Sequence, residues 1–382
     1  MRLKKDSVLA IVRYLAITTM TFVLVAFFAL VTINISFLNP IARVIEDFSM
    51  TDLYYQAMAE GAPDTCRYIT IVDMTDLQRR RDIAQIIDEI EAYNPKVVGV
   101  DIVFEGLKED IIGDMMIEEV ASKYTNIVFA SELKDYDASK GCYTRERQSF
   151  FVDSVSVVEG YTNFEGNIYG GIKRKLSCWR EVNGKNKYSF ASQIFKKYAM
   201  PNKVDLHKDD MDVNYAYTHY PVVRFDSITF NPQLIEGQIV LFGATHEDTD
   251  MKYTPIGMMA GIKLHAYSLK TLISQKDIKD VSWSIVLPLS FLLVLASLWV
   301  REHYLALINK RSDAIKVFLK SDLMIGVFTF SWMVLLMGCA FLIFGIFGWS
   351  MNMGLALSAI VFLRSATVFY DTCVKSLKSY KS

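Results

Sequence analysis

"CRYITIVDMTDLQRRRDIAQIIDEIEAYNPKVVGVDIVF" (residues 66–104) holds two short apolar runs with a helix-like stretch between them. The runs at 66–74 and 96–104 are rich in β-branched residues, as in buried strands. The stretch between them repeats an apolar residue every three or four positions, which places these residues on one helix face. They are Ile83, Ile86, Ile87 and Ile90. The segment predicts a strand, a helix and a second strand, the unit of right-handed crossovers in parallel sheets.

The same alternation continues toward the C-terminus. Further helices are predicted at 109–124, 189–200 and 260–273, and further strands at 126–133, 212–217, 221–225 and 237–245. Between residues 140 and 190 the apolar period drops toward two, and turn residues stand at Gly166, Gly170-Gly171 and Asn183-Gly184, which favours inserted hairpins. We therefore expect an α/β extracytoplasmic domain with a parallel-type sheet and inserted hairpins.

The rest of the chain is too apolar for an ordinary soluble protein. Hydrophobic residues make up 52% of it, and the mean hydropathy is +0.23. Four apolar runs predict transmembrane helices at 8–31, 283–300, 323–347 and 348–363. Between them we expect a cytoplasmic N-terminus (1–7), an extracytoplasmic domain (32–281), a basic cytoplasmic loop (301–322) and a basic cytoplasmic tail (364–382).

Charge placement predicts the orientation. Outside residues 33–281 the chain has thirteen basic and five acidic residues, whereas that segment has 28 basic and 37 acidic residues. Basic residues next to spans stay in the cytoplasm, so both termini are expected there, in a bacterial inner membrane with the large domain in the periplasm. An acidic exterior argues against nucleic-acid binding, and the expected non-protein partner is membrane lipid.

Three features near the N-terminus and in the domain concern processing and covalent modification. A cleaved secretory signal also begins with basic residues and an apolar run, but this run is longer than usual and no A-x-A-like site follows, so an uncleaved anchor is expected. Asn34-Ile35-Ser36 fits the glycosylation pattern close to the membrane. Cys142 and Cys178 could pair in an oxidising compartment, or the external thiols could all be unpaired.

Enzymatic signatures are absent from the sequence. It lacks a G-x-G-x-x-G after a strand, a phosphate-binding G-x-x-x-x-G-K-[ST], an H-E-x-x-H and a G-x-S-x-G elbow. No cofactor is implied, and we expect a protein that is not an enzyme.

Three motifs in order carry a family resemblance: "PKVVGVDIVF" (95–104), "GQIVLFGATHEDTDMKYTPIG" (237–257) and "GIKLHAYSLKTLI" (261–273). With one span before them and three after, the chain resembles the second type of CHASE domain, an extracellular sensory module associated with cyclases and histidine kinases. The resemblance implies an input domain coupled through three spans to a cytoplasmic output domain. Only a short basic tail follows residue 363, so a stand-alone sensor with a separate effector is expected.

Four residues are candidate ligand contacts. Asp73 lies at the end of the first predicted strand and Asp101 within the second, and the carboxyl ends of strands line the ligand crevice of open α/β sheets. The alternative is a structural aspartate held by hydrogen bonds. Asp250 lies in a polar loop, where bonds to the backbone are the alternative. His265 lies on a predicted helix, as a core residue or as a sensor of external pH.

His246, Glu247, Asp248 and Asp250 follow a strand closely enough to suggest a metal site, with His246 and Asp248 as weak candidates, yet their spacing matches no calcium or zinc motif. No metal is therefore expected. The basic stretch 172–180 is either a solvated face or a patch for an anionic ligand.

Three functions compete. The first is a sensor of an unknown small-molecule or protein stimulus, which acts on a separate cytoplasmic or membrane effector through residues 301–322 and the tail. The second is a constitutive envelope scaffold, and the third is a hydrolase using Asp101, Asp250 and His265. A homodimer is expected only by analogy with signalling modules.

Overall fold

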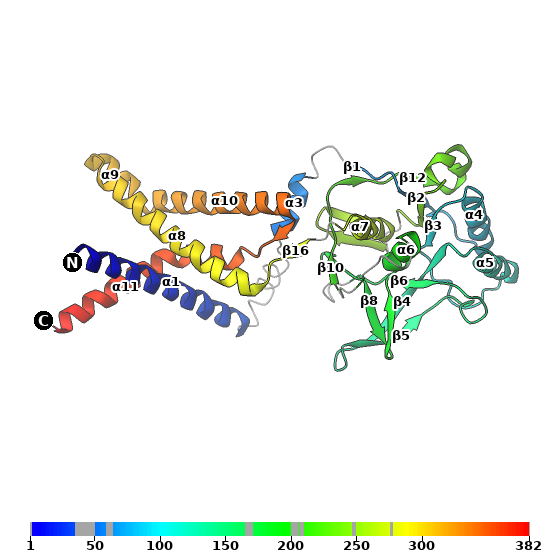
Figure 1. The fold of residues 1–382 in the computed structure, drawn as a ribbon, viewed down its shortest axis with the longest axis horizontal. Helices are drawn as coiled ribbons and strands as arrows, with labels where there is room; N and C mark the ends of the chain where they lie inside the picture. The colour runs from blue at the N-terminus through cyan, green and yellow to red at the C-terminus, as the bar shows by residue number, and fades with distance from the viewer. Residues whose placement is uncertain are drawn as a thin grey trace. The chain divides into compact units, whose positions relative to one another are not determined.

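The computed structural model describes residues 2–34, 50–58, 64–164, 171–199, 206, 210–246, 250–275 and 278–381. The chain divides into two compact units, which we describe separately. One is Asp52–Ile278, and the other combines Met1–Thr51 with Lys279–Ser382. Figure 1 shows that the first unit is built of strands and helices and the second of long helices.

A mixed sheet forms the framework of the α/β unit. Its strand order among the described residues is β12-β2-β13-β3-β4-β5-β8-β9, and β6 also pairs with β4. The strands are β2 (Ile69–Asp73), β3 (Val97–Val100), β4 (Ile127–Asp137), β5 (Cys142–Arg147), β6 (Glu159–Tyr161), β8 (Trp179–Val182), β9 (Lys185–Tyr188), β12 (Val222–Arg224) and β13 (Ile239–Gly243). The six strands β12, β2, β13, β3, β4 and β6 run parallel. The hairpins β4–β5 and β8–β9 are antiparallel, so the mixed α/β fold is confirmed.

Helices cover both faces of the parallel strands, which explains why β3 and β13 are buried along their whole length. One face packs against α4 (Arg80–Ala92) and α5 (Ile111–Lys123) through the main hydrophobic core. The other face packs against α6 (Phe190–Ala199) and α7 (Gly261–Ser274). The four predicted isoleucines of α4 all join the core, with Ile86 at its partly buried edge.

Some details differ from the sequence-based expectation. The strand predicted at 212–217 is wrong in its bounds, because β10 (Asp210–Asp212) reaches only its first residue and β11 (Thr218–His219) begins after its last. There the backbone amide of Asn214 bonds to the hydroxyl of Thr271 instead of a neighbouring strand. The Asn183-Gly184 turn joins β8 and β9 as predicted. Gly166 and Gly170 lie outside the described residues, and so do Ile35 and Ser36 of the glycosylation pattern.

The structure contains no disulfide bond between the five cysteines, all of which lie in its described part. Cys66 and Cys178 are buried, and Cys142 is partly exposed. The pairing of Cys142 with Cys178 is therefore not present in this structure.

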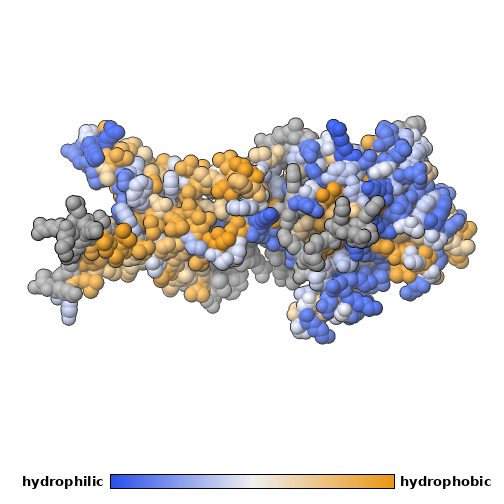
Figure 2. All heavy atoms as spheres, viewed as in Figure 1, coloured by the Kyte–Doolittle hydropathy of each residue, from blue (hydrophilic) through white to orange (hydrophobic). Residues whose placement is uncertain are grey.

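The second unit contains four helices long and apolar enough to cross a membrane, counted over the described residues. They are α1 (Arg2–Asn34), α8 (Trp283–Asn309), α10 (Asp322–Phe347) and α11 (Gly354–Lys381), with the short α9 (Asp313–Leu319) between α8 and α10. Figure 2 shows the hydrophobic surface that they present. An apolar outer surface on long helices is typical of contact with lipid.

Several helix boundaries differ from the predicted spans: α1 is longer at both ends, and α11 continues to Lys381, through the predicted tail. The helix predicted at 283–300 continues to Asn309 because residues 301–309 add apolar side chains that keep its pattern. The last helix begins at Gly354 and not at residue 348. Gly348 ends α10 in a left-handed conformation with φ of 68°, and β17 (Trp349–Ser350) then pairs with β16 (Lys279–Asp280) before the chain turns into α11.

Candidate functional site

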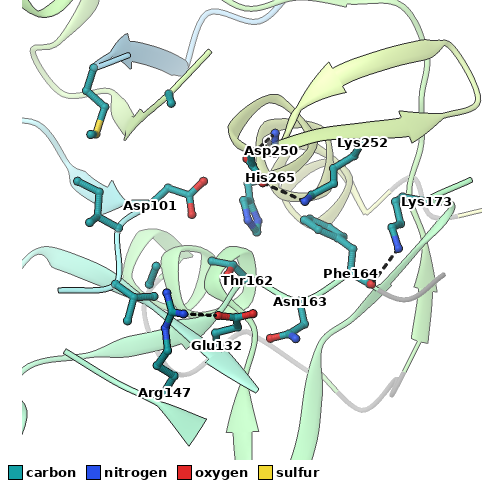
Figure 3. Close-up of a pocket in the computed structure, with 16 residues that line it drawn as sticks. Asp101, Glu132, Arg147, Thr162, Asn163, Phe164, Lys173, Asp250, Lys252 and His265 are labelled. Atoms are coloured by element: carbon teal, nitrogen blue, oxygen red, sulfur yellow. Dashed lines mark hydrogen bonds and ion pairs between the residues drawn. The ribbon is translucent and has the colours of Figure 1, made fainter. Parts of the chain in front are cut away.

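A cavity of about 540 Å³ lies at the edge where the parallel strands end. Met74, Asp101 and Ala244, each the first residue after a strand, contribute to its wall. This is the edge at which open α/β sheets bind ligands. Figure 3 shows the charged and aromatic side chains that surround the cavity. The ionisable residues among them are Asp101, Glu132, Arg147, Lys173, Asp250, Lys252 and His265.

Three of the four predicted ligand contacts line this cavity: Asp101, Asp250 and His265. The carboxylate of Asp101 points toward the imidazole of His265 in Figure 3. These residues come from the end of β3, the segment before β14 (Met251–Thr254) and helix α7, so the tertiary fold joins parts of the chain more than 160 positions apart.

Asp73, the fourth candidate, does not line the cavity. Its carboxylate accepts hydrogen bonds from the Thr75 hydroxyl at 2.6 Å and from the backbone amides of Thr75 and Thr245, both at 3.1 Å. Burial alone would raise the pKa of Asp73, but these bonds stabilise the ionised form and lower the pKa below its ordinary value. Asp73 is therefore held by hydrogen bonds, as in the structural alternative, and links the segments that follow β2 and β13.

Asp250 has two roles at the cavity wall. One carboxylate oxygen accepts a bond from the backbone amide of Gly261, the first residue of α7, at 3.0 Å. The other lies 3.0 Å from the ammonium of Lys252. The expected bond to the backbone is confirmed. The residues that follow Asp250 form an antiparallel hairpin of β14 and β15 (Gly257–Ala260) where a loop was expected.

His265 is buried, with 3% of its surface exposed. Its ring lies 4.7 Å from the ring of Phe164 and 5.0 Å from that of Phe190, and its Nδ1 has no hydrogen-bond partner. Burial, with a smaller contribution from the charge of Lys252, lowers the pKa of His265 to about 3. A ring with so low a pKa is neutral at physiological pH and is a weak base, which favours the core alternative for His265.

The cations of the cavity were only partly visible in the sequence. Lys173 belongs to the basic stretch 172–180 and faces the cavity. The other basic residues of that stretch form ion pairs outside the cavity: Arg174 with Asp52, Lys175 with Asp212 and Arg180 with Asp210. Arg147 lies 3.4 Å from Glu132. Neither residue was a candidate, because no motif marks the pairing of β4 with β5 that brings them together.

Of the two described residues that suggested a metal site, Asp250 lines the cavity and His246 does not. His246 is exposed, and Glu247 and Asp248 lie outside the described residues. Within the part of the chain that the structure describes, no three His, Cys, Asp or Glu residues are arranged to hold a metal ion.

Chemically, the cavity offers charges of both signs, a neutral imidazole and an aromatic ring around a volume suited to a small molecule. Such a lining recognises a polar ligand through charge-assisted hydrogen bonds.

Comparison with known proteins gives one result. The family model described as "CHASE2 domain" matches residues 22–300, which is well over half of the chain. Curated proteins and solved structures give no significant match. The match contains every strand that borders the cavity, together with α1 from residue 22 and most of α8. The chain therefore belongs to the CHASE2 family of extracellular sensory domains.

Proposed function

We propose that this protein is a multi-pass membrane sensor that detects an extracytoplasmic signal in the cavity and passes the response to a separate protein. One observation carries the proposal. A sensory-family domain holds a polar cavity with a buried, unpartnered histidine, and candidate membrane helices stand before and after this domain in the chain. We propose that the cavity binds its ligand without catalysis, since a neutral imidazole of low pKa is a poor general base.

We propose that both termini face the cytoplasm of a bacterial cell and that the α/β unit lies in the periplasm. The basic residues around α9, Lys310, Arg311, Lys316 and Lys320, support this orientation. So do the basic residues near the end of α11. These two segments are also the surfaces proposed to contact the inner effector.

Backbone bonds within the helical unit offer a route for the signal. The amide of Lys279 donates to the carbonyl of Gly348 at 2.9 Å, and the amide of Val281 donates to that of Ser350 at 2.9 Å. They join the segment entering α8 to the turn between α10 and α11. On the opposite ends of the helices, Arg13 of α1 forms ion pairs with Glu302 of α8 and Asp371 of α11. A shift of the segment before α8 therefore reaches the other membrane helices.

The orientation is tested with single cysteines in a chain whose five native cysteines are replaced. A membrane-impermeant maleimide applied to intact cells should label a cysteine at position 140 and leave one at position 310 unlabelled until the cells are permeabilised. Labelling of 310 but not 140 in intact cells would refute the sensory orientation. Photo-crosslinkers at positions 310 and 375 then identify the inner effector.

A constitutive scaffold is the second candidate, because one observation favours it. Four apolar side chains at the start of α5 are exposed: Leu107 (76%), Ile111 (68%), Ile112 (54%) and Met115 (64%). Exposed apolar clusters often mark protein contacts. An Ile111→Asp variant that loses a stoichiometric external partner under all growth conditions would favour the scaffold over the sensor.

A further inference from the structure

One of the lysines that line the cavity has no acidic partner in the described part of the chain. Lys173 is partly buried, and among the described residues its ammonium bonds to the carbonyl oxygen of Phe164, at 3.5 Å. No carboxylate among the described residues pairs with it. Lys252 pairs with Asp250, whose second oxygen is already bonded to the amide of Gly261. Of these two ammonium groups, that of Lys252 therefore has a carboxylate partner among the described residues and that of Lys173 has none.

The two lysines belong to one wall of the cavity. The backbone amide of Lys173 donates to the carbonyl of Tyr253 at 2.8 Å, which places Lys173 against the strand that carries Lys252. Burial and the charge of Lys252 both lower the pKa of Lys173. A nearby anion would relieve this repulsion.

His265 supplies an independent sign of a ligand. It lines the same cavity and is almost fully buried, and its Nδ1 has no partner. An unpartnered buried polar atom costs free energy unless a bound molecule completes its hydrogen bond. The ring of Phe164, 4.7 Å from the imidazole, gives an apolar surface beside that atom.

We propose that the cavity binds a small organic monocarboxylate whose carboxylate group lies among Lys173, Lys252 and the imidazole of His265, with its carbon skeleton against Phe164. This inference rests on the proposed function, since it names the class of ligand that the sensor detects. Asp101, Glu132 and Asp250 line the same cavity and would repel a second negative charge. A monoanion therefore fits better than a dianion such as hydrogen phosphate.

The test uses the full chain in detergent and isothermal titration calorimetry. The probes are benzoate, phenylacetate and lactate, each compared with its primary amide, and inorganic phosphate. At least one carboxylate should bind to saturation at a single site. Its amide should bind with an affinity at least about tenfold lower, because the amide lacks the charge that strengthens these hydrogen bonds. Lys173→Gln should weaken that carboxylate at least about tenfold, Lys173→Arg should retain most of the affinity, and Lys185→Gln, an exposed control, should leave it unchanged.

Three results would overturn the ligand class: no carboxylate binds, the amides bind equally well, or phosphate binds more tightly than every carboxylate. Loss of binding in Lys173→Gln counts only if this variant unfolds at the same temperature as Lys185→Gln. If the two unfolding temperatures differ, the titration is repeated with Lys252→Gln in place of Lys173→Gln.

A parallel measurement separates this inference from the proposed function. The maleimide reaction rate of a cysteine at position 310 is followed in membranes with and without the bound carboxylate. Binding without a change in this rate would refute the sensor and retain the carboxylate site. If extracts of growth medium change the rate while no carboxylate binds, the sensor stands and the ligand class is wrong.

Discussion

The carboxylate of Asp250 accepts a hydrogen bond at 3.0 Å from the backbone amide of Gly261, where helix α7 begins. The same carboxylate holds the ammonium of Lys252 at 3.0 Å beside the cavity. One side chain thus stabilises a helix N-terminus and positions a charged group of the candidate site. Helix N-termini gain from such acceptors because their first amides have no partner within the helix.

Replacing Asp250 with alanine should reduce the free energy of unfolding by about 1 kcal/mol, the usual cost of losing a helix N-terminal acceptor. Unfolding is followed in urea through the reaction of buried Cys66 and Cys178 with a thiol dye, in a chain whose other cysteines are alanine. Asp153→Ala, at an exposed position, is the control and should change little. Equal stability of the two variants would contradict the capping role.

Gly261→Ala should also destabilise the domain, because the new Cβ would lie 2.3 Å from Oδ2 of Asp250. The carboxylate would have to move, and its bond to the helix would be lost. In the Asp250→Ala background the same change should cost almost nothing, since the obstructing atoms are gone. The double-mutant cycle in urea measures this coupling, and additive effects would show that the two residues act independently.

The buried ion pair between Arg80 and Asp114 should be costly to break. Both side chains are less than one tenth exposed, and Arg80 also bonds to the carbonyl of Gly106 at 2.9 Å. Asp114→Asn leaves a buried guanidinium without its counter-charge and should cost about 3 to 5 kcal/mol. The matched control is Asp88→Asn, which breaks the exposed pair with Lys123 and should cost less than about 1 kcal/mol. Similar losses for both variants would be incompatible with this difference in burial.

The burial of Glu91 should make the free energy of unfolding of the domain fall as the pH rises. Its burial raises its pKa to about 7, although a bond from Asn126 partly opposes the shift. The folded chain then holds a proton that the unfolded chain releases near pH 4.5, so stability falls between about pH 4.5 and 7. Glu91→Gln should remove this fall and gain up to about 3 kcal/mol over the wild type at pH 8, with no gain at pH 4.

The measurement is the urea midpoint at a series of pH values. Glu236→Gln, an exposed position, is the control and should keep the wild-type pH profile. A Glu91→Gln variant with the same profile would show that another group causes the dependence.

His265→Phe should stabilise the domain while removing ligand binding. The substitution deletes the unpartnered Nδ1, whose burial costs about 1 kcal/mol or more, and keeps an aromatic ring between Phe164 and Phe190. Thermal unfolding is measured together with titration of the carboxylate that binds the wild type, with His246→Phe, at an exposed position, as control. A lower unfolding temperature in His265→Phe would indicate that the imidazole contributes to packing in some other way.

Much of the fold could be predicted from the local periodicity and composition of the sequence. The isoleucines of α4 recur with the helical period, and the β-branched runs of β2, β3 and β13 are buried as their composition predicts. The predicted strand at 212–217 failed because its tyrosines are held by long-range contacts. Tyr215, for example, packs against Tyr55 and Tyr267, and local propensity cannot anticipate such contacts.

The candidate site was predictable only in part. Asp101 lies within a predicted strand, and the structure ends that strand just before it, at the edge where ligands bind. Asp73 lies at the end of the neighbouring strand, but its carboxylate is bonded to Thr75 and Thr245, the second of which is 172 positions away. Lys173 was visible only as part of the basic stretch 172–180, and the structure showed that it lines the cavity without a carboxylate partner among the described residues.

The sequence by itself determined the α/β class, the four apolar helices and the edge of the sheet where a site would form, because these follow from periodicity, length and the direction of parallel strands. The tertiary structure decided which charges are neutralised and which remain at the cavity. That balance depends on distances between residues far apart in the chain, such as Lys173 and Lys252, and on the burial that leaves the Nδ1 of His265 without a partner.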